Sequence, residues 1–517
     1  MNSEIFENNI KKIKFLFFFA ILICSLIQIF LISEFNNYFS LFWLIFSNIL
    51  IYLYCFSLEN LKYYPISIFS LIFTNFYSNA SALFFKSIFF QPIDLNLFDP
   101  NFTYFFLFIV NLLLIFVHII YKKSKLFLAL RVKLQKFYFF INLEKSNDKN
   151  FLIYLGFFSL LFAFISVTFF GDNIFADMSD GPNIVGDILN VTNIFFICPF
   201  IILFTYKFYK FNLKKIDFII IFLSLILLLY ISLGLNARSA FFDTIFVGCL
   251  IYSFFILIGF TDIKILKFNK VFFLIVFFIY LGNAIDKFSD SYLETRAQRD
   301  ITNPLQNIKN HFKSIKRGDN QVKKNELLSN KIFREDYYPL NIVNRINIVK
   351  ATDNILYAKN YLSKDQIKNI YNYEQNQFIS IFPSPFINIF NPNFDKFRYL
   401  DSTITSKIYK SVDKYFEGGK SNGLSFAILF LYEDILFIFI FVISTFLTFS
   451  LLDSFNFKGS FLIIYFVLMY STSGSLVNLI TSGSLSDFFG TLIRIMPQSI
   501  LFFILFFKIY KKLLKRS

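Results

Sequence analysis

Long apolar stretches recur along this chain, and they constrain its fold more than any other feature. A helix that crosses the hydrocarbon core of a bilayer needs roughly 17 to 25 apolar residues. About twelve stretches meet or nearly meet this requirement. They run approximately over residues 15–32, 38–56, 65–83, 102–121, 151–170, 189–206, 216–235, 240–260, 271–284, 436–452, 460–479 and 489–507. We therefore expect an all-α polytopic membrane protein with about twelve transmembrane helices.

The composition supports this class. Hydrophobic residues make up 56% of the chain and charged residues only 16%, whereas soluble chains carry about 25% charged residues. The net charge of +16 comes from blocks of Lys and Arg beside apolar stretches, where they meet anionic lipid headgroups and not nucleic acid. All four cysteines, Cys24, Cys55, Cys198 and Cys249, lie inside apolar stretches, so neither a loop disulfide nor a cysteine metal site is expected.

Loop charge alternates along the chain and predicts the orientation. Basic residues gather on the side of the N-terminus, which the positive-inside rule makes cytoplasmic, and the C-terminus ends on that side too. The other side carries Glu34, Asp94, Asp99, Asp172, Asp177, Asp180 and Asp187. Lys86 and Arg238 are the two exceptions to the alternation.

The charge pattern divides the chain into three parts. Residues 1–285 hold the first nine predicted helices, residues 286–423 form a large loop segment on the far side of the membrane, and residues 424–517 hold the last three helices. Within the loop segment, Leu340, Val343, Ile346 and Val349 recur at helical spacing, and Phe382, Phe386 and Phe390 supply apolar surface near prolines. We expect short amphipathic helices there. The basic stretch 125–143 is predicted to be an interfacial helix on the cytoplasmic side.

Several common chemistries find no support in the sequence. The chain has no P-loop, no GxGxxG after a strand, no HExxH and no GxSxG. Its two histidines are His118, expected as a polar helix-end residue, and His311, expected as an ordinary surface histidine with a base as the alternative. The first outer loop offers only Glu34, and the acids between Asp172 and Asp187 are best explained as a solvated face. A metal site is therefore not favoured.

Arginines on the predicted outer side offer a different chemistry. Arg238 lies in a tight turn between two apolar helices, and the others are Arg296, Arg299, Arg345 and Arg494. Each alone is best explained by a salt bridge or a headgroup contact. Together they match phosphate oxygens, because guanidinium groups bind them bidentately. Glu433 and Asp434 mark either a helix start facing water or a base for an acceptor hydroxyl.

Local strings from about Gly234 onward resemble a known family. Ala237-Arg238-Ser239 looks like a small-Arg-Ser turn before a helix, and Val343-Asn344-Arg345-Ile346 looks like an arginine in a loop helix. A proline-rich hinge at 382–385 and a Gly-Ser stretch at 418–425 precede Tyr432-Glu433-Asp434. With the overall layout, these strings resemble the Wzy-type O-antigen polymerases, also called oligosaccharide repeat unit polymerases. The chain departs from the family at 435–436, where Ile and Leu replace glycines.

The resemblance implies a GT-C-like glycosyltransferase that works without metal or cofactor in the bacterial inner membrane. It would join undecaprenyl-diphosphate-linked oligosaccharide repeat units at the periplasmic face, with the loop segment acting as a lid. Donor and acceptor are then lipid-linked, and membrane lipids and a chain-length regulator protein are further partners. The implied catalytic residues are Arg238, Arg345 and Glu433, and the implied substrate-binding residues are Arg296, Arg299, Tyr432 and Arg494.

Two other functions stay open. An O-antigen ligase has a similar layout and uses a histidine in its large outer loop, so His311 is the residue that bears on it. A transporter or flippase of lipid-linked sugars needs polar residues at mid-membrane depth or paired broken helices. The charged residues singled out above gather instead at the predicted outer boundary.

Overall fold

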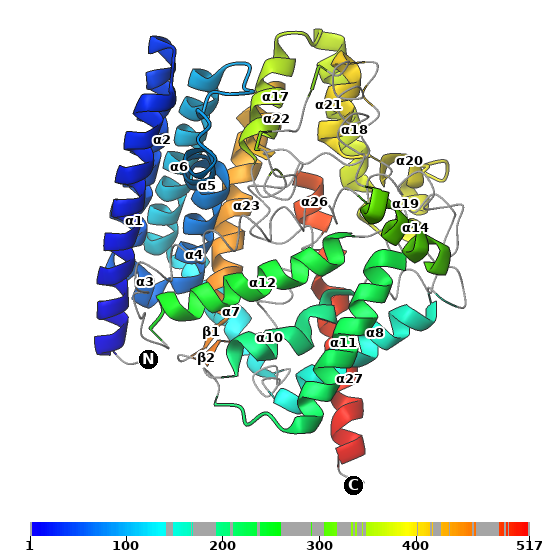
Figure 1. Cartoon of the computed structure of the whole chain (residues 1–517). Helices are drawn as coiled ribbons and strands as arrows, with labels where there is room; N and C mark the ends of the chain where they lie inside the picture. The colour runs from blue at the N-terminus through cyan, green and yellow to red at the C-terminus, as the bar shows by residue number, and fades with distance from the viewer. Residues whose placement is uncertain are drawn as a thin grey trace.

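The computed structural model is helical throughout its described residues, apart from one short hairpin. The N-terminal end of α1 (Ser3–Leu31) and the C-terminal end of α27 (Met496–Leu514) lie at the same end of the view in Figure 1. The structure describes residues 3–140, 148–166, 168, 193–206, 210–234, 238–259, 291, 304–317, 332–333, 337–338, 344, 348–400, 402–413, 416, 425–433, 435–457, 460–461, 485–490, 493–494 and 496–514.

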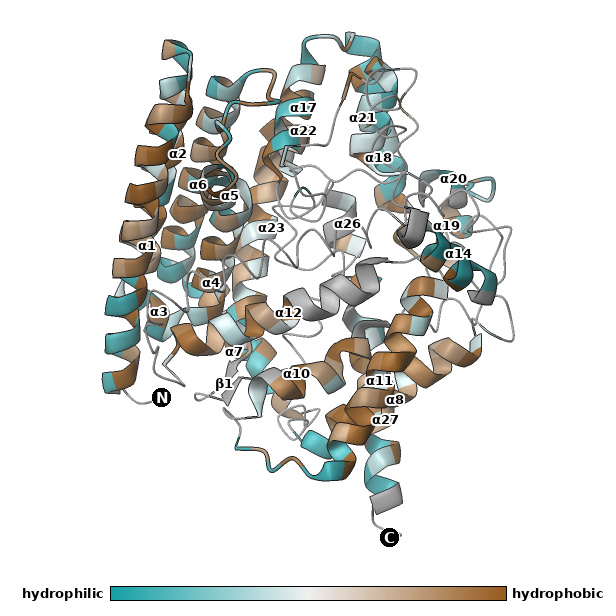
Figure 2. Ribbon diagram, viewed as in Figure 1, coloured by the Kyte–Doolittle hydropathy of each residue, from teal (hydrophilic) through white to brown (hydrophobic). Residues whose placement is uncertain are grey.

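The first part of the chain forms a bundle of upright helices. After α1 come η1 (Phe35–Asn37), α2 (Tyr38–Cys55), α3 (Leu58–Tyr63), α4 (Pro65–Asn75), the π-helical turn η2 (Phe76–Ala80), α5 (Ser81–Ile88) and α6 (Pro100–Lys123). Figure 2 shows α1 as apolar over most of its length, with polar residues at its N-terminal end. Its apolar side chains face outward, and Phe30 is 87% exposed. Such a surface is suited to lipid, because burying apolar side chains against acyl chains removes them from water.

The rest of the chain adds further helices and one hairpin. The middle of the chain forms α7 (Lys125–Phe140), α8 (Lys149–Ile165), η6 (Asn193–Ile197), α10 (Cys198–Thr205), α11 (Lys215–Gly234) and α12 (Arg238–Leu257). The loop segment contributes α14 (Pro304–Arg317), α17 (Val349–Lys359), α18 (Lys364–Ile379), α19 (Ser384–Phe390), α20 (Phe397–Leu400) and α21 (Ile404–Val412). The last part forms α22 (Ser425–Tyr432), α23 (Ile435–Ser454), β1 (Asn456–Phe457), β2 (Ser460–Phe461), α26 (Leu485–Gly490) and α27.

Five stretches of the described chain are helical, long enough and apolar enough to cross a bilayer. They are Glu4–Leu31, Phe35–Cys55, Pro65–Ile88, Pro100–Lys123 and Lys215–Gly234. They coincide with the first four and the seventh of the predicted stretches. The prediction of a helical chain with membrane-spanning segments is therefore confirmed at this level. The total of about twelve stays a prediction.

Three further predicted spans are shorter apolar helices in the structure. They are Lys149–Ile165, Val247–Leu257 within α12, and Ile438–Ser454 within α23. The sixth predicted span is described only from residue 193, where η6 and α10 lie, and the ninth, 271–284, lies outside the described residues. The predicted interfacial stretch 125–143 is helical as α7.

The start of the eleventh predicted span, at Ser460, is wrong. Ser460 and Phe461 form strand β2, which pairs antiparallel with β1 through Asn456 with Phe461 and Phe457 with Ser460. The two residues that connect the strands, 458 and 459, lie outside the described residues. A hairpin therefore stands where the apolar run predicted the first turn of a helix.

The start of the last predicted span, at Phe489, is also wrong. Phe489 belongs to α26, which ends at Gly490, and α27 begins only at Met496. Pro497 follows in the first turn of α27, where proline is tolerated because that amide has no helical partner. Glycine ends one helix here and proline starts the next.

A cluster of amides joins three helices inside the N-terminal bundle. Ser47 and Asn48 come from α2, Asn75 and Asn79 from α4 and η2, and Asn111 from α6, and all are buried. Asn75 Nδ2 donates to Asn48 Oδ1 at 2.8 Å, and Asn111 Nδ2 donates to Ser47 Oγ at 2.8 Å and to Asn75 Oδ1 at 3.0 Å. Polar groups buried in lipid-exposed bundles commonly fasten helices together in this way. The sequence did not predict this cluster.

An aspartate from a distant part of the chain also binds the start of a helix. Asp453, at the C-terminal end of α23, accepts from the Ser67 backbone nitrogen at 3.1 Å and from Ser67 Oγ at 2.8 Å. Ser67 lies in the first turn of α4, where backbone N–H groups have no partner within the helix. Tyr121 of α6 donates to the same carboxylate at 3.2 Å. One carboxylate thus joins α4, α6 and α23.

The loop segment contains several short helices, as predicted, although their positions differ in part. α18 begins with a capping box in which Ser363 and Gln366 satisfy each other's backbone N–H groups. The predicted amphipathic helix over 340–349 lies largely outside the described residues, and the described helix α17 begins at Val349.

Candidate functional site

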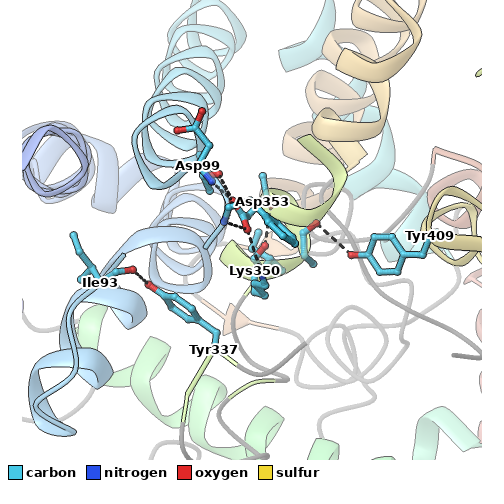
Figure 3. Close-up of polar contacts among 11 residues, drawn as sticks. Ile93, Asp99, Tyr337, Lys350, Asp353 and Tyr409 are labelled. Atoms are coloured by element: carbon cyan, nitrogen blue, oxygen red, sulfur yellow. Dashed lines mark hydrogen bonds and ion pairs between the residues drawn. The ribbon is translucent and has the colours of Figure 1, made fainter. Parts of the chain in front are cut away.

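A buried aspartate of the loop segment holds it against the beginning of α6. Asp353 of α17 is 1% exposed. Its carboxylate accepts from the backbone nitrogen of Phe98 at 2.9 and 3.1 Å, from that of Asp99 at 3.1 Å, and from Thr103 Oγ1 at 3.1 Å (Figure 3). These groups lie at the start of α6, where no helical carbonyl is available to them. Asp353 therefore caps the start of α6, although the two lie far apart in the sequence.

A lysine completes this contact. Lys350 Nζ lies 2.9 Å from Asp353 Oδ2 (Figure 3), and both side chains are buried. The same ammonium group lies 4.2 Å from the centroid of the Phe98 ring. A carboxylate inside a protein is tolerated when charges and hydrogen bonds surround it, as they do here. This makes α17 a fixed part of the structure and not a free loop.

A second buried contact lies beside the first and explains one exception to the charge alternation. Lys86 of α5 is fully buried, and its Nζ lies 4.1 Å from the centroid of the Tyr337 ring. The Tyr337 hydroxyl donates to the Ile93 carbonyl at 2.6 Å (Figure 3) and lies 2.7 Å from the Tyr104 hydroxyl. Lys86 thus packs under the loop segment by a cation–π contact, so it does not count as a solvated loop charge.

The helix α14 of the loop segment contacts the C-terminal end of α11. Asn307 Nδ2 donates to the Gly234 carbonyl at the end of α11 at 2.9 Å. One turn later, His311 hydrogen-bonds the backbone of Leu233, and its Nδ1 lies 3.1 Å from Ser291 Oγ. Asn307 is 2% exposed and His311 1% exposed. The polar face of α14 therefore satisfies the last carbonyls of α11, which lack partners within the helix.

His311 is not an ordinary surface histidine, so that prediction is wrong. The physical reason is the strongly amphipathic pattern of α14, which places Asn307, His311 and Ser314 on one buried face. Burial favours the neutral imidazole and lowers the pKa of His311 to about 4. The ring is therefore uncharged at neutral pH.

This pKa predicts a pH dependence for the docking of α14. Because the pKa of His311 is lower in the folded chain than the ordinary value of about 6.5, its stabilising contribution is complete above pH 6.5 and falls as the pH drops towards 4. Hydrogen exchange of residues 304–317, expressed as protection factors that correct for the faster intrinsic exchange at higher pH, should show less protection at pH 5 than at pH 7. A His311→Gln variant should lose most of this difference. An unchanged pH dependence in that variant would show that another group is responsible.

Arg238 is the first residue of α12. It therefore combines a permanent positive charge with the start of a helix, where free backbone N–H groups and the helix dipole both favour an anion. The preceding residues 235–237 lie outside the described chain. The contacts of α14 lie at Leu233 and Gly234, the last two residues of α11, which precede Arg238 closely in the sequence.

Of the other predicted arginines, the structure describes only Arg494. Arg296, Arg299 and Arg345 lie outside the described residues, so their predicted roles stay predictions. Arg494 lies between α26 and α27 and is partly buried. The described residues bring α14 to the end of α11, and the predicted cluster of five arginines stays a prediction.

Tyr432 and Glu433 form the joint between α22 and α23. Glu433 has a φ of 54°, a conformation that is uncommon for residues other than glycine. Its Oε1 lies 2.7 Å from Lys359 Nζ of α17, and Lys359 also lies 4.0 Å from the centroid of the Phe430 ring. Tyr432 packs edge-on against Tyr371 of α18, with 5.4 Å between ring centroids. α17 and α18 are thus both fastened to this joint.

The ion pair bears on the predicted role of Glu433 as a base. The hydrogen bond and charge of Lys359 lower the pKa of the Glu433 carboxyl. A lower pKa makes the carboxylate a weaker proton acceptor. The Glu433 side chain is also 72% exposed. Its geometry therefore fits a structural ion pair between the loop segment and the start of α23 better than a general base. Asp434 lies outside the described residues.

A serine, a histidine and an aspartate also meet within the bundle, but not as a catalytic triad. His118 Nε2 lies 2.9 Å from Ser67 Oγ, and His118 Nδ1 lies 2.7 Å from the Tyr54 hydroxyl. Asp453 contacts the serine and not the histidine, whereas a triad needs the acid on the second ring nitrogen. All three residues are buried. His118, predicted as a polar helix-end residue, is an internal hydrogen-bonding residue of α6.

Within the described residues, no group of three or more His, Cys, Asp or Glu side chains could hold a metal ion. The acidic stretch 172–187 lies outside them. Glu34 is exposed, and its carboxylate accepts from Asn37 Nδ2 at 3.4 Å.

Sequence reasoning missed the residues that dock the loop segment. Asp353 and Lys350 lie three residues apart and so share a helix face. That spacing is also common on solvated helices, so it carries no information on docking. The polar face of α14 was a usable signal, because Asn307 and His311 are spaced by one helical turn.

Comparison with known proteins identifies no relative. The chain matches no protein-family profile, no curated protein and no solved structure. The function is therefore argued from the residues themselves.

Proposed function

We propose that this chain is a membrane glycosyltransferase that joins lipid-diphosphate-linked oligosaccharide repeat units, the reaction of an O-antigen polymerase. The observation that carries the proposal is the contact of α14 with the end of α11, where Asn307 donates to the Gly234 carbonyl at 2.9 Å. It brings a helix of the loop segment to the end of α11, which precedes Arg238 closely in the sequence. A cationic helix start covered by a folded segment suits a diphosphate headgroup at a membrane boundary.

The proposed glycosyl transfer depends mainly on stabilising the negative charge of the leaving diphosphate. An acceptor hydroxyl attacks the anomeric carbon of the donor sugar, and the bond from that carbon to the diphosphate oxygen breaks. The electron pair leaves with the diphosphate, and the hydroxyl proton passes to a base. Positive groups placed at the leaving diphosphate lower the barrier, because negative charge develops there in the transition state. Arg238 is the first candidate for this role and Arg345 the second, and Arg296, Arg299, Arg494 and Tyr432 remain proposed substrate contacts.

A ligase is the second candidate, and one observation favours it. His311 is neutral, buried and in contact with the end of α11 at Leu233, so an acceptor hydroxyl bound there would find a histidine nearby. The polymerase is preferred because Ser291 Oγ and the Leu233 backbone already hydrogen-bond to the His311 ring. The observation that would favour a transporter is the buried amide cluster of α2, α4, η2 and α6. That cluster is internally hydrogen-bonded and suits helix packing.

A gene deletion distinguishes these functions. If the chain is a polymerase, deletion leaves a surface glycan of one repeat unit. Loss of a ligase leaves a polymer that is still attached to its lipid carrier, and loss of a transporter leaves no surface glycan. Electrophoresis of extracted glycolipids measures all three. A full-length surface polymer in the deletion strain contradicts every version of the proposal.

We further propose that the chain lies in a bacterial inner membrane with both termini in the cytoplasm and the loop segment in the periplasm. The basic end of α6, with Lys122 and Lys123, and the basic end of α27, with Lys511 and Lys512, support this orientation. The Lys350–Asp353 contact lies at the opposite end of α6. Donor, acceptor and a chain-length regulator protein would then meet the chain on the periplasmic side.

Cysteine labelling tests the orientation. In a background with the four native cysteines replaced by alanine, Gln375→Cys on α18 should react with an impermeant maleimide in spheroplasts. Ser124→Cys, at the end of α6, should react only after lysis, because lysine-rich ends stay in the cytoplasm. The control is total labelling after detergent solubilisation. Labelling of Ser124→Cys in sealed spheroplasts would reverse the proposed orientation.

A further inference from the structure

The helices α22 and α23 are folded back on each other. The Phe426 ring of α22 lies 5.2 Å from the Phe441 ring of α23, measured between centroids. These two positions would lie about 22 Å apart in one continuous helix, because each residue adds about 1.5 Å along the axis. We call α22 and α23 together the helical hairpin.

The local sequence does not encode this reversal. No glycine or proline occurs between Ser425 and Ser454. Glycine is the residue that most often ends a helix in a left-handed turn, and proline commonly follows soon after it. Without either signal, the stretch 425–454 has the pattern of one unbroken helix. The local sequence and the observed turn therefore disagree.

The reversal strains the backbone at Glu433. Its φ is 54°, in the left-handed region where the Cβ of a residue other than glycine comes too close to the following carbonyl oxygen. A residue in such a conformation persists only where the surrounding structure holds it there. The groups around Glu433 must therefore stabilise the turn.

The stabilising groups come from the loop segment. Lys359 of α17 has its Nζ 2.7 Å from Glu433 Oε1 and 4.0 Å from the centroid of the Phe430 ring. The same Nζ donates to the Phe430 carbonyl at 3.4 Å. That carbonyl lies near the end of α22, where carbonyls lack helical partners and a lysine is a suitable donor. One lysine thus binds both the end of α22 and the strained residue, and Asp353 fixes its helix on α6.

The packing of α22 against α6 stabilises the hairpin less than it would in water. The rings of Phe426 and Phe430 lie 5.7 and 5.4 Å from the ring of Phe106, measured between centroids. Phe106 belongs to a helix that is long and apolar enough to cross a bilayer. In lipid, such rings exchange one apolar neighbour for another when they separate, because acyl chains are themselves apolar. The contacts of Lys359 are therefore the ones that decide.

We propose that the helical hairpin is a two-state element. While α17 is docked, Lys359 holds the turn at Glu433 and α22 lies against α23. When α17 leaves, α22 and α23 join into one helix over 425–454. The position of the loop segment is thereby coupled to the shape of the membrane part. This coupling does not depend on the reaction that the chain catalyses.

Distances between spin labels distinguish the two states. In the full-length chain with the four native cysteines replaced by alanine, Phe426→Cys and Leu447→Cys carry nitroxide labels in proteoliposomes. In one continuous helix these positions lie roughly 32 Å apart. In the hairpin they lie roughly 13 Å apart, because Phe426 packs beside Phe441 and helices pack at about 8–10 Å. The hairpin gives dipolar broadening, and the continuous helix gives a separate population in pulsed measurements.

Two substitutions of one residue form the matched pair. Glu433→Gly and Glu433→Ala both lose the ion pair with Lys359 and differ only by a methyl group. Glycine adopts a positive φ without strain, whereas alanine favours a helix. We expect Glu433→Ala to raise the long-distance population about fivefold, the effect of left-handed strain, and Glu433→Gly to leave it unchanged.

The second variant tests the lysine. Lys359→Ala should raise the long-distance population as Glu433→Ala does, and adding Glu433→Gly to it should restore the hairpin. Lys368→Ala, which removes an exposed lysine of α18, is the control and should have no effect. An unchanged spectrum in both Glu433→Ala and Lys359→Ala would overturn the proposal, because packing alone would then fix the hairpin. A broad distribution without a separate long distance would overturn it too, because α22 would then unfold and not join α23.

Discussion

Replacing Asp353 by alanine should release the loop segment from the bundle. The change leaves the backbone nitrogens of Phe98 and Asp99 without their acceptor and leaves Lys350 buried without its anion. Removing one partner of a buried ion pair typically costs about 3–5 kcal/mol. That cost is comparable to the stability of a small folded segment, so undocking of α17 is the expected result.

Limited proteolysis of the protein in detergent measures this release. Asp353→Ala should be cleaved between residues 348 and 400 at protease levels that leave the wild type intact. Asp365→Asn is the matched control, because Asp365 is exposed in the first turn of α18 and contributes only a helix-dipole interaction of roughly 0.3–1 kcal/mol. Equal resistance of Asp353→Ala and the wild type would mean that other contacts suffice to dock the loop segment.

Replacing Arg238 by alanine should nearly abolish glycan polymerisation. Loss of one positioned donor at a developing negative charge typically lowers a rate by about 10²- to 10³-fold. Arg238→Lys should retain part of the activity, because lysine keeps the charge but loses the bidentate geometry of the guanidinium. The measurement is the initial rate of polymer formation by purified, reconstituted protein at matched protein levels.

The control for Arg238 is a second arginine that lies outside the proposed site. Arg398→Ala removes an exposed arginine from α20 of the loop segment and should leave the rate within a few-fold of the wild type. If properly inserted Arg238→Ala polymerises at the wild-type rate, Arg238 is a headgroup contact and takes no part in the reaction.

The sequence predicted the helices that depend only on apolar length. The stretches at 15–32, 38–56, 65–83, 102–121 and 216–235 each correspond to a long apolar helix, because lipid imposes a length requirement that can be counted along the chain. The helix starts at 460 and 489 could not be predicted in the same way. At 460 the antiparallel pairing of β1 with β2, and near 489 a proline in the first turn of α27, set the backbone, and neither follows from hydrophobicity.

The candidate site was predicted less well, for a physical reason. Arg238 was recognisable as a charge in a tight turn between apolar helices, and the structure places it at the start of α12. The groups that surround such a residue come from distant parts of the chain. Asn307 approaches Gly234, and Asp353 approaches Phe98, only after the loop segment folds back. Single-residue patterns hold no information on these pairings, so Lys359 was not foreseen as the partner of Glu433.

Reconstitution of the purified wild-type chain tests the central claim most directly. The protein is placed in proteoliposomes with a synthetic undecaprenyl-diphosphate repeat unit and no nucleotide, and the lipid-linked products are resolved by mass spectrometry. The account predicts a ladder of lipid-linked glycans that differ by whole repeat units, with one equivalent of undecaprenyl diphosphate released for each bond formed. A repeat unit that stays single, even when it crosses to the opposite leaflet, would contradict the polymerase and indicate a transporter.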